Sequence, residues 1–419
     1  MRSWWSRAAM ILVSFPGRCL LWRPRPRLRR LIYCWKGISM TLEEVRRQID
    51  AIDSQLVPLF CRRMDCSREV AKIKERENLP IFNAQREEEI LNRVAQEAGE
   101  YGDAARMLYA SIMQASRALQ HGALHSGKEL RRQIQTAGKP ILSEKKPVVA
   151  CPGVAGSFSH QAAMRLYPGS KAAFYPVFED VFSAVDRDEA DFGVIPVENS
   201  SAGSVSDVYD LLLRYRFSIV GAAHLSIRHF LCASENASLK TVKQVYSHPQ
   251  ALSQCSLKIK AHGLKPVNYS NTAAAAEMVA MEKNPALAAI CSREAAKEYG
   301  LNILEENVQN SSANQTRFVA ISKALSIPDD ADKISLCFSL NHTTGSLYSV
   351  LGRFAMLGLN LTKIESRPIP DRKFEHYFEY FFYLDFIGSV RDDKVLDLIC
   401  ALSDELPGFS FLGNYREAE

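Results

Sequence analysis

Residues 41 to about 124 carry apolar positions at helical spacing throughout. Proline and glycine interrupt the stretch at "ENLP" (77–80) and "GEYGD" (99–103), so it predicts three helices. In the first helix, one register advances by alternating steps of four and three residues, the spacing of a packed helical seam. That register consists of Val45, Ile49, Ile52, Leu56, Leu59, Arg63, Cys66, Val70 and Ile73.

The pattern changes after Val148, where short β-branched runs alternate with helical segments up to about Ala324. This alternation predicts an α/β region, and its length favours a sheet divided between two lobes. The expected strands lie in "PVVACPG", "FGVIPVEN", "SIVGAAHLSI", "VKQVYSHP", "LAAICS" and "RFVAIS".

A third pattern follows "SIPDDADK" and has the order β-α-β-β-α-β, which predicts a ferredoxin-like α+β module. Its expected elements are "ISLCFSL", "LYSVLGRFAMLG", "LTKIESRP", "EYFFYLDFIG", "DDKVLDLICALSDE" and "FLGNY". The chain is therefore expected to be multidomain. The expected parts are an all-α domain at 40–124, a basic linker at 125–146, an α/β domain at 147–325 and the α+β module at 332–415.

Residues 1–39 form a basic tail with eight Arg, one Lys, no acidic residue and all four Trp of the chain. We interpret this tail as an Arg-rich targeting segment, a signal peptide, or sequence upstream of a natural start at Met40. The net charge of +5 comes from the tail, and the rest of the chain is mildly acidic. The charge therefore gives no reason to expect nucleic acid as a partner.

The composition, with 47% hydrophobic and 24% charged residues, is that of a globular protein. No apolar run reaches the ~20 residues of a membrane span. The ten cysteines are scattered without metal-binding spacing, which predicts free thiols in a reducing cytoplasm and no metal. The sequence also lacks a GxSxG elbow, a P-loop and an HExxH motif, so we expect a cofactor-free protein.

Arg63 stands in the core register of the first helix, where a charge is costly unless an anion meets it. Lys74 lies on nearly the same face, whereas Arg46 lies ~25 Å back along the helix and is turned away. Two antiparallel chains would bring all three to one ligand, so we expect an intertwined helical homodimer. On the third helix, Ser116 and Gln120 extend a core-facing ridge. Alternatively, Arg63 snorkels to solvent and the polar pair is an ordinary bundle edge.

The spacing of these polar residues resembles that of the all-helical chorismate mutases. The resemblance implies that arginines clamp the two carboxylates of chorismate and that Lys74 and Gln120 meet its ether oxygen. That rearrangement is pericyclic and needs positioning and charge stabilisation only. Asn83 stands where the family usually has aspartate, and Pro58 falls inside the first helix. The implied site comprises Arg46, Arg63, Lys74, Asn83, Arg86, Glu87, Ser116 and Gln120.

The α/β segment repeatedly passes from a strand into Gly, Ser, Thr or Asn and then into a helix. Hydroxyls and backbone amides at helix N-termini would then converge at strand ends, an arrangement that suits a small polyanion. Any single junction of this kind is equally explained by helix capping. The junctions are "GVAGSFSH", "VENSSAGSVSD", "YSHPQALSQ", "YSNTAAAAE" and "ICSREAA".

These motifs and "NQTRFVAIS" resemble the prephenate dehydratase domain. The resemblance implies that Thr316 assists departure of the ring hydroxyl of prephenate, with Arg317 beside it for orientation or charge and Phe318 completing the motif. Threonine is a poor acid, so positioning and the aromatic product must carry most of the reaction. The remaining implied binding residues are Asn199, Ser200, Ser201, Ser247, His248 and Gln250.

The last module resembles the ACT domain that follows prephenate dehydratases. "ESRP" matches the family motif fully, and "GSLY" stands for its usual GALV. The resemblance implies a phenylalanine site at a domain interface and feedback inhibition, although such a module can also serve dimerisation alone. The implied regulatory residues are Gly345, Ser346, Leu347, Glu365, Ser366, Arg367 and Pro368.

Together the resemblances imply a bifunctional chorismate mutase/prephenate dehydratase of the cytoplasm, inhibited by phenylalanine and at least dimeric. Two alternatives stay open. In the first, the helical domain is a non-catalytic dimerisation domain beside an active dehydratase. In the second, the whole chain is a ligand-binding regulatory protein. The sequence leaves the choice between prephenate and arogenate open.

Overall fold

The structure, a computed structural model, describes residues 41–138, 146–340, 345–368 and 380–418. The expected basic tail at 1–39 lies outside the described residues. The chain divides into two compact units, one ending at Leu59 and the other beginning at Phe60.

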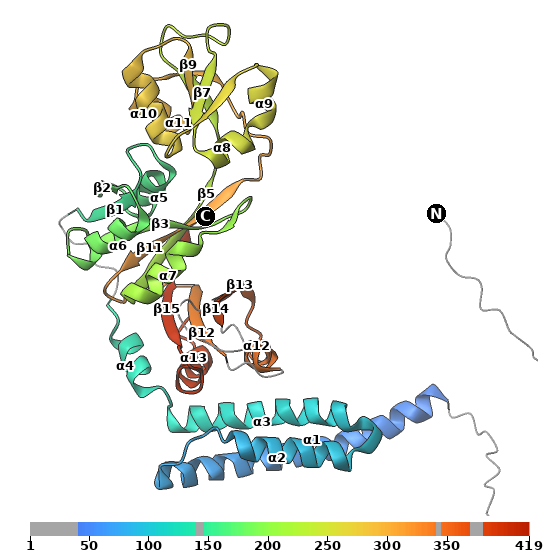
Figure 1. The fold of residues 1–419 in the computed structure, drawn as a ribbon. Coiled ribbons are helices and arrows are strands. Elements are labelled where there is room, and N and C mark those ends of the chain that lie inside the picture. Colours follow the sequence, from blue (N-terminus) through green and yellow to red (C-terminus); the bar gives the residue numbers. More distant parts are fainter. Residues whose placement is uncertain (1–40, 139–145, 341–344, 369–379, 419) are drawn as a thin grey trace, which may run out of the picture. The chain divides into compact units, whose positions relative to one another are not determined.

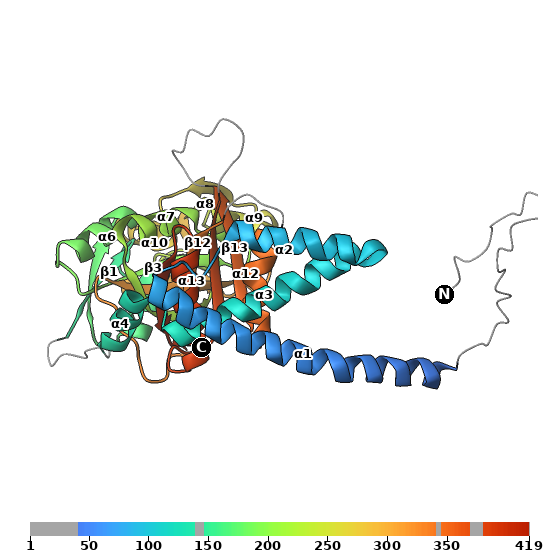
Figure 2. The ribbon, with the colours of Figure 1, turned by 90° about the horizontal axis from the view of Figure 1, so that it is seen from below.

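The three helices expected at the start of the chain are present: α1 (Leu42–Glu77), α2 (Ala84–Glu97) and α3 (Gly102–Leu124). A short 3-10 turn, Gly99–Tyr101, lies within the predicted glycine-containing break. Helix α1 continues through Pro58. Asn83 caps α2, because its side-chain oxygen accepts from the backbone N–H of Arg86. Helices α2 and α3 pack side by side (Figure 2).

Helix α1 exposes much of the predicted apolar register. Ile49 is 51% exposed, Ile52 57% and Leu56 53%. Such a continuous apolar stripe on one chain is characteristic of a surface that another element covers. The register expected to be a packed seam is therefore largely solvent-accessible in the single chain, and its packing stays a prediction.

The predicted linker contains a helix, α4 (Lys128–Thr136), which was not expected. Leu130 and Ile134 are four residues apart and pack on the core of the last module. Arg131 forms a salt bridge of 2.5 Å with Asp397. The basic composition concealed this short amphipathic pattern.

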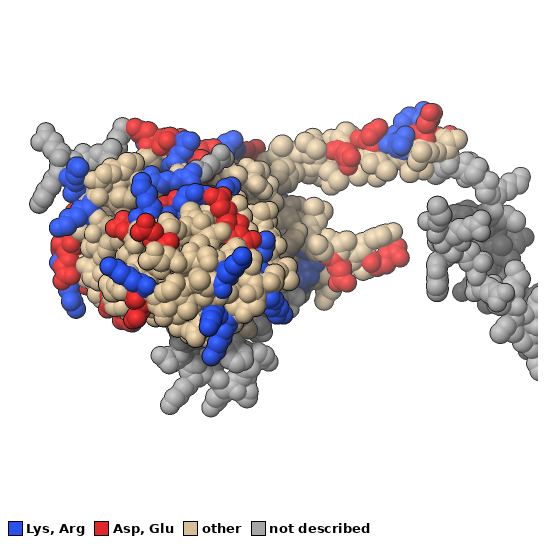
Figure 3. Space-filling view, turned by 90° about the horizontal axis from the view of Figure 1, so that it is seen from above, with Lys and Arg blue, Asp and Glu red and all other residues tan. Residues whose placement is uncertain are grey.

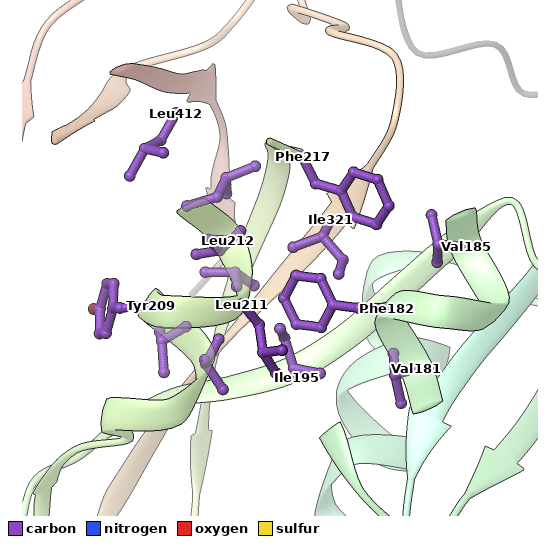
Figure 4. Packing of buried hydrophobic residues seen from close by; sticks show 14 of the residues in the cluster. Val181, Phe182, Val185, Ile195, Tyr209, Leu211, Leu212, Phe217, Ile321 and Leu412 are labelled. Carbon is purple, nitrogen blue, oxygen red and sulfur yellow. The ribbon is translucent and has the colours of Figure 1, made fainter. Parts of the chain in front are cut away.

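The first sheet of the α/β region has the strand order β16-β5-β11-β3-β1-β2, with β4 paired to β3. Figure 4 shows its core, where Phe182, Leu212 and Ile321 meet from two helices and a strand. The strands are β1 (Val148–Pro152), β2 (Lys171–Tyr175), β3 (Phe192–Asn199), β4 (Gly203–Ser204), β5 (Ser218–Ser226), β11 (Gln315–Ser322) and β16 (Glu417–Ala418). The helices are α5 (Phe158–Leu166), α6 (Phe178–Asp186) and α7 (Ser206–Tyr215).

The second sheet has the order β10-β6-β9-β7-β8, so the predicted division into two lobes is confirmed (Figure 1). Strands β6, β8 and β10 were not among the predicted strands, since short segments such as the edge strand β8 carry little β-branched pattern. The strands are β6 (Phe230–Ala233), β7 (Gln244–Ser247), β8 (Lys265–Asn268), β9 (Leu287–Cys291) and β10 (Asn302–Glu305). The helices are α8 (Pro249–Gln254), α9 (Ser256–Ala261), α10 (Thr272–Glu282) and α11 (Arg293–Glu298).

The chain crosses between the lobes twice, from β5 to β6 and from β10 to β11. The two crossings are hydrogen-bonded to each other: the Ile227 N–H donates to the Asn314 carbonyl at 2.8 Å, and the Val308 N–H donates to the His229 carbonyl at 2.9 Å. The lobes also touch at Gly156, where a Cβ would lie 2.6 Å from the Cα of Ala295. These contacts fix the lobes beside the cavity described below.

The third sheet has the order β13-β14-β12-β15 and the predicted β-α-β-β-α-β connectivity. After β15 the chain continues into β16, which pairs in parallel with β5 of the first sheet. This strand lies beyond the predicted end of the module at residue 415. The elements are β12 (Lys333–Ser339), α12 (Ser346–Met356), β13 (Leu361–Pro368), β14 (Tyr380–Ile387), α13 (Asp393–Glu405) and β15 (Ser410–Tyr415).

Charged side chains of both signs lie on the surface (Figure 3), and the described cysteines are unpaired. Acidic and basic side chains alternate over the face in Figure 3. The eight cysteines within the described residues are free, as expected. In the part of the chain that the structure describes, no helix has the length and apolar character needed to span a membrane.

Candidate functional site

Two predicted mutase residues lie together on α3. Ser116 and Gln120 are both buried, and the Gln120 side-chain N–H donates to the Ser116 carbonyl at 3.3 Å. The hydroxyl of Ser116 is 2.5 Å from that of Ser67 on α1. The Oε1 atom of Gln120 is buried and has no hydrogen-bond partner in the described structure. An unpaired buried acceptor of this kind suits a ligand that brings a donor.

A second set of polar contacts connects α1, α2 and α3 through charged side chains. Glu87 forms a salt bridge with Arg117 of α3. Burial lowers the pKa of Lys74, the charge of Glu87 opposes this, and Arg117 lowers the pKa further. The Lys74 ammonium donates to the Ile81 carbonyl. Sequence reasoning missed Arg117, which directly follows the predicted Ser116 and carries no motif of its own.

Arg63 has a buried Nη1 atom without a hydrogen-bond partner among the described residues. An unsatisfied buried guanidinium nitrogen calls for an anionic acceptor. The other two predicted arginines are exposed: Arg46 lies in the first unit, and Arg86 forms an i,i+3 pair with Glu89 at 3.2 Å. Asn83, as described, caps α2. Within the second unit, the structure of one chain therefore does not bring Asn83 and Arg86 to the buried group.

The α/β region contains a cavity of about 450 Å³ where the lobes meet. Thr316 and Phe318 line it from β11, as does Asn199 from β3. His248 and Gln250 line it from the start of α8. These five predicted residues are thus brought together. Sequence reasoning missed His229 and Asn314 and did not single out three further lining residues within its junction motifs, which are Ser157, Gln254 and Asn271.

Thr316 is 8% exposed and pairs with Asn199 across β11 and β3. Its Oγ1 atom accepts a hydrogen bond of 2.7 Å from the Asn199 side-chain N–H. Because this bond occupies one lone pair of the oxygen, the Thr316 hydroxyl proton points away from the Asn199 nitrogen and is free to face the cavity. The Asn199 oxygen accepts from the backbone N–H groups of Ser201 at 3.0 Å and Ala202 at 3.1 Å, which fixes the amide orientation.

Helix N-termini also face this cavity, as the junction pattern predicted. Ser157 caps α5 by accepting from the His160 N–H at 3.3 Å, and Asn271 caps α10 by accepting from the Ala274 N–H at 2.7 Å. Both caps line the cavity. Helix N-termini favour anions. Burial lowers the pKa of His248, so this lining histidine favours its neutral form.

Three predicted binding residues do not line the cavity. Ser247 is fully buried, and its hydroxyl donates to the Ile290 carbonyl at 2.6 Å. The Ser200 hydroxyl donates to the Ala313 carbonyl at 3.1 Å and holds the loop that precedes β11. The Ser201 hydroxyl donates to the Asn314 side chain at 3.4 Å. Their contacts are with the protein itself, so they shape the site from outside.

Arg317 also points away from the cavity, because successive residues of a strand face opposite sides. It is 6% exposed and reaches Asp385 at 2.5 Å, Glu417 at 2.6 Å and the Tyr415 hydroxyl at 2.7 Å. The expectation that Arg317 orients substrate beside Thr316 is therefore corrected: Arg317 joins β11 to the last module.

The predicted regulatory residues divide between two faces of β13. Glu365 is hydrogen-bonded to the Ser204 hydroxyl, and Arg367 to the Ser206 carbonyl and, at 3.2 Å, to Asp210. Ser366 and Pro368 are exposed on the opposite face. Gly345, with φ of 83°, precedes α12, and Ser346 and Leu347 begin that helix half-buried. The motif thus contacts the α/β region directly.

Comparison with known proteins gives two matching families. The chorismate mutase type II model matches residues 45–121, and the prephenate dehydratase model matches residues 149–325. A bifunctional chorismate mutase/prephenate dehydratase of Aquifex aeolicus is 34% identical over 382 residues, which are 90% of this chain and 98% of the relative. Arogenate dehydratase 2 of Petunia hybrida is 39% identical over 279 residues, 64% of this chain and 71% of the relative.

Among solved structures, the prephenate dehydratase of Arthrobacter aurescens in complex with L-Phe superimposes with a TM-score of 0.59 at 30% identity. The match covers 65% of this chain and 90% of the other.

Proposed function

The chain belongs to the family of bifunctional chorismate mutase/prephenate dehydratases, and from this premise we propose how its residues divide the two reactions. The protein converts chorismate to prephenate and then prephenate to phenylpyruvate, in the biosynthesis of phenylalanine. We assign the first reaction to residues 40–124, the second to residues 147–325 and regulation to residues 332–415. Residues 125–146 connect them.

In the mutase site, Arg63 binds a carboxylate of chorismate, while Lys74 and Gln120 contact the ether oxygen whose bond breaks. The unpaired Nη1 of Arg63 supports its contact with a carboxylate. Glu87 contacts the substrate hydroxyl, and Ser116 contacts the second carboxylate. The burial that lowers the pKa of Lys74 also strengthens its charge interactions in the site. Catalysis here is positioning and electrostatic stabilisation.

A second copy of the chain completes this site. The exposed apolar stripe of α1 supports a homodimer in which α1 packs against its partner. Arg46 then enters the pocket of the other protomer, which accounts for its exposure in the single chain. Arg86 and Asn83 at the start of α2 border the same pocket.

In the dehydratase site, Thr316 donates a hydrogen bond to the departing ring hydroxyl of prephenate. The bond between C1 and its carboxylate breaks, its electron pair enters the ring, and the C4–O bond breaks in the same sense. CO₂ leaves, the hydroxyl leaves as water after taking up one proton from solvent, and the aromatic ring drives the reaction. The hydrogen bond from Asn199 to Thr316 supports this role, because it directs the hydroxyl proton to the cavity.

Binding of the rest of prephenate falls to the cavity lining. Phe318 packs on the ring, while Gln250 and His248 at the start of α8 are placed to contact a carboxylate. The N-termini of α5 and α10 add positive potential for the second carboxylate. Ser200, Ser201 and Ser247 support the loops from outside the cavity.

The last module is an ACT-type regulatory domain that binds phenylalanine and lowers dehydratase activity. Two observations support this: the contacts of Glu365 and Arg367 with residues 204–210, and the L-Phe complex of the Arthrobacter aurescens dehydratase. Gly203 pairs with Asn199 across β4 and β3, so a movement of β13 at Ser204 is passed on to the donor to Thr316. The free thiols of the described cysteines support a cytoplasmic location.

Two single substitutions in the full chain test the division of labour. Thr316→Ala removes the proposed donor and is expected to abolish phenylpyruvate formation while chorismate turnover continues. Arg63→Ala is expected to reduce chorismate turnover by ~10² or more while added prephenate is still consumed. Dehydration by Thr316→Ala at the wild-type rate would refute the assignment of Thr316, and unchanged mutase activity in Arg63→Ala would refute that of Arg63.

A further inference from the structure

A chain of polar side chains runs from Thr316 across the cavity to His229 on the other interlobe crossing. The Asn199 oxygen is held by two backbone N–H groups, so its side-chain nitrogen must face the two remaining acceptors. One acceptor is Thr316 Oγ1 and the other is Asn314 Oδ1, at 2.9 Å. The orientation of Asn314 follows: its nitrogen points away from Asn199.

The same logic fixes the next two residues. The Asn314 nitrogen donates to Gln254 Oε1 at 3.1 Å, so this Gln254 atom is an acceptor. His229 Nε2 lies 3.2 Å from the same oxygen and must therefore donate to it. Neutral His229 consequently carries its proton on Nε2, and its Nδ1 atom is a bare acceptor.

His229 Nδ1 is buried and has no hydrogen-bond partner among the described residues, although the side chain lines the cavity. The residue is 2% exposed, and burial lowers the pKa of its imidazole more than the Gln254 hydrogen bond raises it. The ring is thus neutral near pH 7. The Phe158 ring stands edge-on to it, with centroids 6.0 Å apart, and limits its rotation.

A buried unpaired acceptor is costly unless a ligand supplies a donor. Prephenate at neutral pH carries two carboxylates, a ketone and one hydroxyl, and only the hydroxyl donates. We propose that His229 Nδ1 accepts a hydrogen bond from the ring hydroxyl of bound prephenate and is thus a second residue in contact with the leaving group. This inference rests on the dehydratase function proposed above.

The proposed contact complements that of Thr316. His229 Nδ1 accepts the hydrogen bond that the substrate hydroxyl donates, and this turns an oxygen lone pair of the hydroxyl towards Thr316. The leaving oxygen is held between an acceptor and a donor, and both are set by one network anchored on the backbone of Ser201 and Ala202. No proton moves to His229 in this role: it orients the C4–O bond for cleavage.

Two variants separate the nitrogens of His229. His229→Gln places an amide near the Nε2 position and keeps a donor for Gln254, but it removes the acceptor at Nδ1. His229→Asn places its amide near Nδ1 and keeps the acceptor there. Each is made in the full chain, with and without Thr316→Ala, which stops turnover for binding measurements. Urea unfolding followed by circular dichroism reports that each variant is folded, because mutase activity reports only on residues 40–124.

Calorimetry then compares prephenate with phenylpyruvate, which lacks the ring hydroxyl. His229→Gln in the Thr316→Ala background is expected to weaken prephenate binding about tenfold and to change phenylpyruvate binding less than about twofold. His229→Asn is expected to weaken prephenate binding less than His229→Gln does. In the single variants, kcat/KM for prephenate follows the same order. Equal weakening of both ligands, or of neither, would overturn the contact. Turnover by Thr316→Ala itself would instead contradict the proposed function of Thr316.

Discussion

Replacing Arg317 with methionine tests whether this arginine serves the substrate or the structure. Methionine approximates the length of the side chain and removes its charge and hydrogen bonds. In the structure, Arg317 is 6% exposed and contacts two carboxylates, Asp385, which is itself 8% exposed, and Glu417, which is 16% exposed. The substitution leaves Asp385 buried without its cationic partner.

Removing one partner of a buried pair costs about 3–5 kcal/mol. The expected result is a destabilisation of this size, seen as an earlier transition in urea unfolding followed by circular dichroism. The control Asp385→Asn, remote from the cavity, is expected to destabilise as well. In the Arg317→Met, Asp385→Asn double variant, the loss is expected to be smaller than the sum of the single losses, since the unpaired carboxylate is gone.

The kinetic readout separates the two interpretations. If Arg317 acts only through the structure, the KM for prephenate of the folded Arg317→Met protein stays within about twofold of wild type. A rise in KM of tenfold or more without a loss of stability would show that Arg317 binds substrate, and would refute the argument from strand alternation.

Three further predictions follow from single contacts. Asn199→Asp replaces the donor to Thr316 with an acceptor, so kcat for prephenate is expected to fall by ~10² or more at unchanged mutase activity, and a steady-state assay of both reactions checks this. Burial alone raises the pKa of Glu405, but His121, Arg353 and Arg117 outweigh it and hold that pKa at about 2. The ionised Glu405 therefore adds about 3 kcal/mol to the free energy of unfolding above pH ~4.5, and this contribution is lost as the pH falls to ~2. In acid unfolding, wild type should lose stability over this window, and Glu405→Gln should not show that loss. Leu56→Asp places a charge in the exposed stripe of α1 and is expected to yield monomers with little mutase activity in sedimentation and rate measurements, with exposed Asp53→Asn as control.

Much of the architecture follows from local patterns in the sequence. The three helices, the two-lobed α/β region and the β-α-β-β-α-β order were predicted because each has a long periodic segment or clear breaks. Helix α4 was missed because its two apolar residues stand among charged ones. Strand β16 was missed because a two-residue pairing with β5 depends on a partner about 200 residues away.

The candidate sites were predictable where a motif fixes chemistry and less so where tertiary contacts decide it. Thr316 and Asn199 were found by motif, and both line the cavity. The position of Arg317 contradicts the expectation, although strand alternation already places it opposite Thr316. His229 carries no motif, and its role depends on a tautomer set by Gln254 and Asn314 through contacts that only the fold creates.

A time course of the full chain with chorismate tests the central claim most directly. Prephenate and phenylpyruvate are measured together, with and without phenylalanine, and with added prephenate as a second starting substrate. The account predicts that prephenate forms first and phenylpyruvate follows, and that phenylalanine slows the second step so that prephenate accumulates. Consumption of added prephenate with chorismate untouched would contradict the bifunctional assignment, and consumption of neither would leave a ligand-binding protein.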